Sequence, residues 1–313
     1  MQPQYNVPQY SDDHYAVVDL GSNSFHLLIA RIVNNEVVVV DKIKRKVRLA
    51  SGLNKQHQLS EAIISDGLDC LKIFSQYLSS VPLQNISIVA TATLRIAINR
   101  DEFLTKANKI LPLPINLLTG KQEAATIFNG VAHTSTNHKK RLVIDIGGAS
   151  TEIIVGKGFE AQHSVSLNIG CVSFNKNYFI DGMLTPEHFK DAIEAAHEII
   201  EPIANDFIAL GWEISVGSSG TMQALMEILQ HRECPLTITH SFLIELQQEM
   251  VTFNSISNVQ FDGLRADRVA VLASGLCILI ALFECLSIES LCLSKGALRE
   301  GLLFSMLPTT LPE

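Results

Sequence analysis

Two short segments of this chain repeat one pattern of residues. In 19–24 and again in 145–150, an Asp is followed by Gly two positions later and by Ser five positions later. Each Asp ends an apolar run and each Ser opens another, so both segments are predicted to be tight polar turns between strands. Such a turn gathers backbone N–H groups around an anion, and its carboxylate can hold a divalent cation. Because the pattern occurs twice, it favours a duplicated phosphate-binding fold over an ordinary hairpin turn.

The composition indicates a globular chain that can form two domains. Its 313 residues are 47% apolar, which excludes a disordered protein. Residues 1–14 are polar and lack the features of a signal peptide, so we expect a flexible N-terminal tail. The most apolar run, Val269 to Phe283, is shorter than the ~20 residues of a membrane-spanning helix and is predicted to be a helix buried between domains.

Cysteine usage and charge exclude several classes of protein. The 6 Cys residues show no Cys-x-x-Cys pair and no His spacing typical of zinc, which indicates reduced thiols in a cytoplasm. A net charge of -8 argues against general nucleic-acid binding. Five basic residues nevertheless lie close together, and they form either a charged strand edge or a patch that attracts polyanions: Lys42, Lys44, Arg45, Lys46 and Arg48.

Helix-boundary residues and a polar connector predict the division into domains. A helix is expected over 60–78 with Ser60 as its N-cap, and another over 186–210 with Thr185 as its N-cap. The polar and basic segment 133–141 is typical of a connector. We therefore expect a first domain over residues 15–132, a second over 133–300, and a C-terminal segment, 301–313, that packs back on the first domain.

Two further segments lie where an α/β sheet presents ligands. Arg95 follows the predicted strand 86–90 at its carboxyl end, which makes ligand contact by its side chain plausible. The predicted strand 214–216 leads into a turn of small residues that we expect to bind phosphate or ribose. The turn consists of Gly217, Ser218, Ser219, Gly220 and Thr221.

Taken together, these residues resemble the exopolyphosphatase and guanosine pentaphosphate phosphohydrolase (Ppx/GppA) family, in a short two-domain form. The resemblance spans roughly residues 15–304 and is carried by segments 17–26, 90–95, 119–124, 143–152, 170–174, 217–221 and 296–301. It implies an α/β fold of two actin-like, ribonuclease H-like domains, as in sugar kinases, heat-shock ATPases and actin. It also implies an active-site cleft between them.

The resemblance implies a reaction and a role for each candidate residue. The reaction is hydrolysis of the terminal phosphate of polyphosphate or of the 5′ γ-phosphate of guanosine pentaphosphate. Glu123 would position or deprotonate the water, and Arg95 would donate to phosphoryl oxygens. Asp19, Asp145 and Glu152 would hold Mg²⁺, with Mn²⁺ as the alternative. The expected phosphate contacts are the turn 217–221 together with Gly21, Ser22, Asn23, Ser24, Gly147, Gly148, Ala149 and Ser150.

Three positions depart from the family pattern. Ala149 replaces a usual third glycine, Gln122 replaces a carboxylate that often precedes Glu123, and Lys295 replaces a common Asp. Two alternatives to hydrolysis stay open. Ala149 leaves open a non-catalytic sensor that binds an alarmone or nucleotide, and an actin-like ATPase or kinase would need an adenosine pocket that the turn 217–221 alone does not establish. Beyond the substrate we expect no nucleic-acid or membrane partner, while a homodimer stays open.

Overall fold

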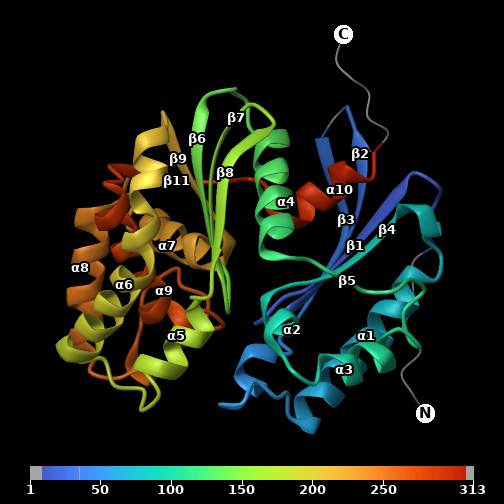
Figure 1. Cartoon of the computed structure of the whole chain (residues 1–313), viewed down its shortest axis with the longest axis horizontal. Helices are drawn as coiled ribbons and strands as arrows, with labels where there is room; N and C mark the ends of the chain where they lie inside the picture. Colours follow the sequence, from blue (N-terminus) through green and yellow to red (C-terminus); the bar gives the residue numbers. More distant parts are fainter. Residues whose placement is uncertain (1–8, 35, 308–313) are drawn as a thin grey trace. The chain divides into compact units, whose positions relative to one another are not determined.

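The computed structural model describes residues 9–34 and 36–307. They form two compact units: unit 1 comprises residues up to Thr119 together with those from Arg299, and unit 2 comprises Gly120–Leu298. Each unit is built on one mixed sheet flanked by helices (Figure 1), which confirms the predicted α/β class.

Unit 1 contains a five-stranded sheet in the order β3-β2-β1-β4-β5. Strand β1 runs antiparallel to β2 and parallel to β4. Its elements are β1 (His14–Leu20), β2 (Phe25–Val33), β3 (Glu36–Arg45), η1 (Leu49–Gly52), α1 (Glu61–Leu78), η2 (Leu83–Asn85), β4 (Ile86–Ala90), α2 (Ala92–Ile96), α3 (Arg100–Ala107), β5 (Asn116–Leu117) and α10 (Leu298–Ser305).

Helix α1 covers one face of this sheet. Ser60 caps it by accepting a hydrogen bond from the Ile63 N–H group, which confirms the predicted helix start. The buried side chains of α1, among them Leu71 and Phe74, pack in one core with alternate residues of the strands, such as Val18 and Leu27. The helix-forming pattern and the strand alternation therefore meet in a single hydrophobic core.

Unit 2 contains a six-stranded sheet in the order β10-β11-β9-β6-β7-β8. Its elements are α4 (Gly120–His133), β6 (Lys140–Ile146), β7 (Thr151–Lys157), β8 (Glu160–Leu167), α5 (Cys171–Tyr178), α6 (Pro186–Leu210), β9 (Ile214–Ser218), α7 (Ser219–His231), β10 (Ile238–Thr239), α8 (His240–Thr252), η3 (Ile256–Asn258), α9 (Val269–Leu286) and β11 (Ser290–Leu293).

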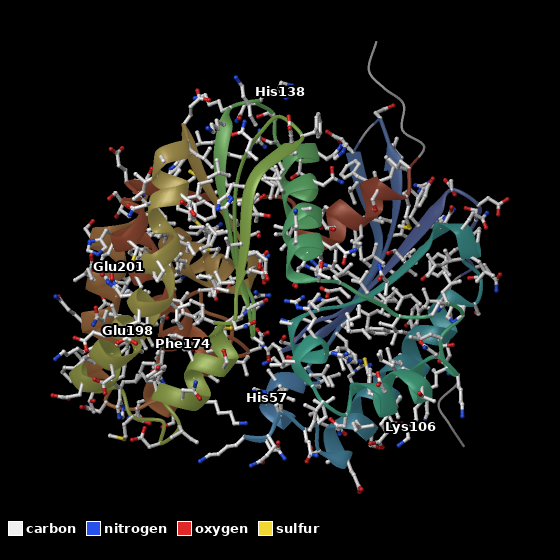
Figure 2. All side chains as sticks on the ribbon, in the orientation of Figure 1. His57, Lys106, His138, Phe174, Glu198 and Glu201 are labelled. Carbon is white, nitrogen blue, oxygen red and sulfur yellow. The ribbon has the colours of Figure 1, made fainter. Side chains whose placement is uncertain are left out.

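Helices cover both faces of the unit 2 sheet (Figure 1). Helix α4 packs on β7 and β8, where a Cβ at Gly156 would meet the Phe128 ring at 2.4 Å. Helix α6 packs on the opposite face, and the rings of Phe207 and His163 lie 4.6 Å apart there. Figure 2 marks the exposed side of α6 by Glu198 and Glu201.

Helix α9 is the apolar run that the sequence predicted to be buried. Among the described residues it is the one helix long and apolar enough to span a membrane, and 72% of it is buried. It packs against α5, α6 and α8 within unit 2. The expected burial is therefore observed, but its partners all belong to one unit rather than to both.

The structure divides the chain earlier than the connector suggested. The boundary falls between Thr119 and Gly120 rather than between residues 132 and 133, because α4 packs on β7 and β8 of unit 2. Residues 9–13 also differ from the expected tail, since Tyr10 is buried in the unit 1 core and its hydroxyl donates to Asp41 at 2.7 Å. The rest of that tail, 1–8, lies outside the described residues, as does 308–313 of the C-terminal segment.

Candidate active site

A row of polar residues crosses four neighbouring strands of the unit 2 sheet. In the strand registers, Asp145 pairs with Ser218 on one side and with Glu152 on the other, and Glu152 pairs with Ser166. The hydroxyl of Ser218 donates to Asp145, and that of Ser166 donates to Glu152 at 2.7 Å. Paired positions put side chains on the same face of a sheet, so the register alone brings two carboxylates together.

Helix α4 brings a third carboxylate to this row. Its first residue, Gly120, approaches β8 so closely that a Cβ there would lie 2.5 Å from the Ser166 Cβ. Glu123 follows in the first turn of α4 and is only 6% exposed. The predicted catalytic residue therefore lies in a buried acidic cluster rather than at an exposed helix end, where a carboxylate would merely favour the helix dipole.

The three carboxylates of this cluster interact electrostatically. Burial, reinforced by the negative charges of Glu123 and Asp145, raises the pKa of Glu152 well above its ordinary value. Hydrogen bonds from Ser166 and Ser150 act in the opposite direction on that pKa. A positive charge bound here would therefore relieve a repulsion that is built into the sheet.

The turn 147–150 is closed by its own backbone and by helix α5. The Gly147 N–H group donates to the Ser150 carbonyl at 2.9 Å, and a Cβ on Gly147 would lie 3.0 Å from that oxygen. The carbonyl of Gly147 accepts from the Cys171 N–H, and that of Gly148 from Val172. Ala149 does not adopt a positive φ, so the missing third glycine imposes no backbone strain at this position.

The turn between β9 and α7 is the third predicted phosphate site. Gly217 and Ser218 end the strand, and the following residues open the helix. Ser219 has a φ of 88°, an uncommon value for a residue with a side chain, and its buried hydroxyl has no hydrogen-bond partner among the described residues. Such strain at a helix N-terminus is a feature of anion-binding turns.

Arg268, which the sequence did not single out, packs on this third turn. A Cβ at Gly220 would lie 2.1 Å from the Arg268 Cζ, so the guanidinium rests directly on the glycine. Burial lowers the pKa of Arg268, and its Nε has no hydrogen-bond partner in the described part of the chain. The available clue in the sequence was an arginine beside an apolar helix, which by itself indicates only a helix boundary.

Unit 1 repeats the turn with different surroundings. A Cβ on Gly21 would lie 3.0 Å from the Ser24 carbonyl, the same spacing as at Gly147. Ser22 and Ser24 are buried, and the Ser24 hydroxyl lacks a hydrogen-bond partner among the described residues. Asp19 pairs in register with His26, and His26 pairs with Lys44, so a histidine stands beside the carboxylate and a lysine beside that histidine.

Arg95 lies beyond the carboxyl end of β4, as predicted, in the short helix α2. It is partly buried, and its Nη1 donates to the Leu118 carbonyl at 3.0 Å. The predicted residues thus fall into two groups. Asp19, Arg95 and the turn 21–24 belong to unit 1, whereas Glu123, Asp145, Glu152 and the turns 147–150 and 217–221 belong to unit 2.

The acidic cluster has the donor chemistry of a hard divalent cation. Carboxylate oxygens are the ligands that Mg²⁺ prefers, and it commonly retains several waters. In the described ranges, no three His, Cys, Asp or Glu side chains are already arranged to hold a metal ion. The chemistry of the carboxylate oxygens nevertheless fits a hard divalent cation.

Comparison with known proteins agrees with the resemblance seen in the sequence. The chain is 50% identical over 292 residues to a guanosine-5′-triphosphate,3′-diphosphate pyrophosphatase of Vibrio parahaemolyticus, covering 93% of this chain and 59% of that protein. The corresponding Aliivibrio fischeri protein is also 50% identical, with 94% and 59% covered. The chain thus spans less than two thirds of the length of the curated relatives that it matches.

Solved structures share the fold. An exopolyphosphatase from Cytophaga hutchinsonii superposes with a TM-score of 0.83 at 23% identity, covering 94% of this chain and 97% of that one. The Aquifex aeolicus Ppx/GppA family member gives a TM-score of 0.74 at 24% identity, covering 93% and 96%. A model of the Ppx/GppA phosphatase family matches residues 28–310. With the repeated turns in place, this chain belongs to the Ppx/GppA phosphatase family.

Proposed function

We propose that this protein is a phosphoanhydride hydrolase that removes the terminal phosphate of guanosine pentaphosphate or of inorganic polyphosphate. The single observation that carries the proposal is the row Ser218, Asp145, Glu152 and Ser166, in which Ser218 and Glu152 are buried, with the buried Glu123 beside it. A cluster of this kind is costly to bury unless it serves a cation and its ligand. Relatives named as guanosine-5′-triphosphate,3′-diphosphate pyrophosphatases support the choice of substrate.

Phosphoryl transfer requires several roles, which we assign to different residues of the site. The transition state needs an in-line water and neutralised charge on the phosphoryl oxygens, while covalent chemistry by the protein is minor. We assign the water to Glu123 and the phosphate oxygens to the turns 21–24, 147–150 and 217–221, with the Arg95 guanidinium as a further donor. Asp19, Asp145 and Glu152 are the proposed ligands of Mg²⁺, or of Mn²⁺ in its place, and the cation would supply positive charge to the phosphate oxygens.

The acidic cluster of unit 2 favours a bound cation. Burial raises the pKa of Glu152, and the positive charge of a bound Mg²⁺ would lower that pKa again, which favours the ionised form that binds a cation. The negative charge of Glu123 adds to the upward shift of that pKa. We infer that Glu123 takes the proton of the attacking water, while Ser166 and Ser150 hold Glu152 in place.

Phosphate release tests this function directly. Purified protein is incubated with guanosine pentaphosphate, tripolyphosphate, long-chain polyphosphate or ATP, each with and without Mg²⁺. Mg²⁺-dependent release of phosphate from guanosine pentaphosphate or from either polyphosphate supports the hydrolase. Binding of guanosine pentaphosphate without release would indicate the sensor, and phosphate transfer from ATP to an acceptor would indicate the kinase. We place this activity in the cytoplasm, without a nucleic-acid or membrane partner.

A further inference from the structure

Arg48 has a strained backbone at the end of the basic stretch of unit 1. Its φ and ψ are 58° and 44°, the left-handed helical region. Residues with a Cβ rarely adopt this conformation, which glycine or asparagine tolerates better. Strain of this kind persists when the surrounding structure enforces it and is common at functional sites.

The surrounding structure is the first phosphate turn itself. The Arg48 N–H group donates to the Asn23 carbonyl at 2.9 Å, and the Ala50 N–H group donates to the Ser22 carbonyl at 2.9 Å. Leu49 and Ala50 are buried and anchor the segment, whereas the Arg48 side chain is exposed. The strained residue is therefore fixed to the two central residues of the turn 21–24, with its side chain in solvent.

The guanidinium of Arg48 is not used by the fold. Within the described ranges it makes no hydrogen bond or ion pair, whereas Lys42, Lys44 and Lys46 of the same stretch each interact with other residues. The backbone of Arg48 is hydrogen-bonded to the Asn23 carbonyl, so its long side chain starts beside the turn and can reach an anion bound there. The buried Ser24 hydroxyl, also without a partner in the described structure, adds a donor there.

We propose that Arg48 binds a phosphate group of the substrate at the turn 21–24 and thereby sets the affinity for the phosphate chain. This inference rests on the proposed hydrolase function and adds a contact that the turn motif does not contain. A guanidinium presents a planar fork of N–H donors that matches phosphate oxygens. Asparagine would fit the left-handed backbone at position 48 with less strain, but it lacks a guanidinium. We infer that arginine stands there because it supplies the fork of N–H donors.

Three substitutions separate the side chain from the backbone. Arg48→Asn and Arg48→Gly both suit the left-handed conformation and remove the charge, so we expect an unchanged or higher Tm. The same variants are expected to raise KM for guanosine pentaphosphate about 10- to 100-fold with little change in kcat, the loss expected for a hydrogen bond to a charged group. Arg48→Lys keeps the charge and the strain but loses the fork, so its KM is expected to lie between those of Arg48→Asn and the wild type.

Arg45→Asn is the matched control, because it removes the same charge from the same stretch. Its KM is expected to rise less than threefold and to converge with that of the wild type at high salt, as screening removes long-range attraction. Equal increases in KM for Arg45→Asn and Arg48→Asn would overturn the proposal in favour of general attraction by the stretch. A KM for Arg48→Gly within twofold of the wild type would overturn it as well.

A binding measurement keeps this inference separate from the proposed reaction. Calorimetric titration with tripolyphosphate in the absence of Mg²⁺, where no hydrolysis is expected, should give a Kd that Arg48→Asn raises about 10- to 100-fold. If the wild-type protein releases no phosphate from any substrate, the hydrolase proposal fails. The titration still tests Arg48 in that case, since equal Kd values for wild type and Arg48→Asn would contradict the contact.

Discussion

The two phosphate turns share their backbone geometry but differ in the chemistry around them. A Cβ on Gly21 or on Gly147 would lie 3.0 Å from the carbonyl oxygen of the Ser three residues later. In unit 2, the leading Asp145 stands in register with a second carboxylate, Glu152. In unit 1, the leading Asp19 stands in register with His26, next to Lys44. One turn therefore collects negative charge, and the other has basic neighbours.

The segments that are hydrogen-bonded to the two turns also differ. Backbone N–H groups at the start of α5 hold the unit 2 turn, with a buried cysteine as the first residue of that helix. Burial raises the pKa of this Cys171 thiol to about 11, so it stays neutral. The unit 1 turn is instead held by the loop that carries Arg48. The two copies of the turn therefore differ in the segments that support them, and in the described part of the chain the turn of unit 2 lies beside a cluster of three carboxylates.

The strongest test of this division is Glu123→Gln. We expect it to lower kcat roughly 100-fold or more, since a general base contributes about that factor or more. The fold should remain intact, because the substitution removes one of the charges that raise the pKa of Glu152. Phosphate release and thermal unfolding measure the two effects separately.

Glu187→Gln provides the matched control for Glu123. Glu187 also lies in the first turn of a helix, α6, but its side chain is exposed. The control should keep near wild-type kcat. If Glu123→Gln retained that level too, Glu123 would be an ordinary helix-start carboxylate, and the proton of the water would have to leave by another route.

The sequence predicted the parts of the molecule that follow from local chemistry. Ser60, Thr185 and the spacing of apolar residues identified two helices with their correct starts. The repeated Asp-x-Gly-x-x-Ser pattern identified both turns, because tight turns depend on residues close together in the chain. The extent of the second unit was missed, since the packing of α4 on β7 and β8 is a tertiary contact that no local pattern encodes.

The candidate site was predicted as a set of residues but not as an arrangement. Asp145 and Glu152 were chosen as cation ligands, yet their direct pairing depends on strand register, which the turn fixes only once its geometry is known. Ser166 and Arg268 were not chosen at all. Each reaches its partner from a distant element, so neither belongs to a local motif.

Alanine substitutions at the glycines test how much each unit depends on the support of its turn. At Gly170, a Cβ would lie 2.5 Å from the Ala149 nitrogen and the Gly148 carbonyl carbon, which are backbone atoms that cannot rotate away. Gly170→Ala should therefore lower the free energy of unfolding by about 2–3 kcal/mol, and Gly21→Ala, at 3.0 Å from Ser24 O, by about 1 kcal/mol. Urea unfolding measures both, and equal losses would show that the two supports constrain their turns alike.

The acidic cluster should also make the stability of the protein depend on pH. Because the pKa of Glu152 is raised in the folded state, unfolding releases a proton between its unfolded-state and folded-state pKa values. The free energy of unfolding should therefore fall as pH rises through that window. Glu152→Gln should remove that slope, so its stability relative to wild type should increase with pH when measured without Mg²⁺. Glu198→Gln, on the exposed side of α6, is the control, and its free energy of unfolding should change with pH as that of the wild type does. If the wild type and Glu152→Gln showed the same dependence on pH, the raised pKa of Glu152 would be contradicted.

The smallest expected losses of stability come from substitutions at the helix caps. One cap lies in each unit, so they compare the two units at sites outside the phosphate turns. Ser60 accepts from the Ile63 N–H at 3.4 Å, and Thr185 accepts from the His188 N–H at 3.2 Å. Replacing either by Ala leaves one N–H group without its cap and should cost about 1 kcal/mol, with the shorter bond at Thr185 giving the larger loss. Neither residue touches a turn, so kcat and KM should stay at wild-type values while the urea midpoint falls. If Ser60→Ala lowered kcat or raised KM under conditions where the protein stays folded, α1 would position the unit 1 turn. The functional difference between the units could then no longer be assigned to Arg48 and the acidic cluster alone.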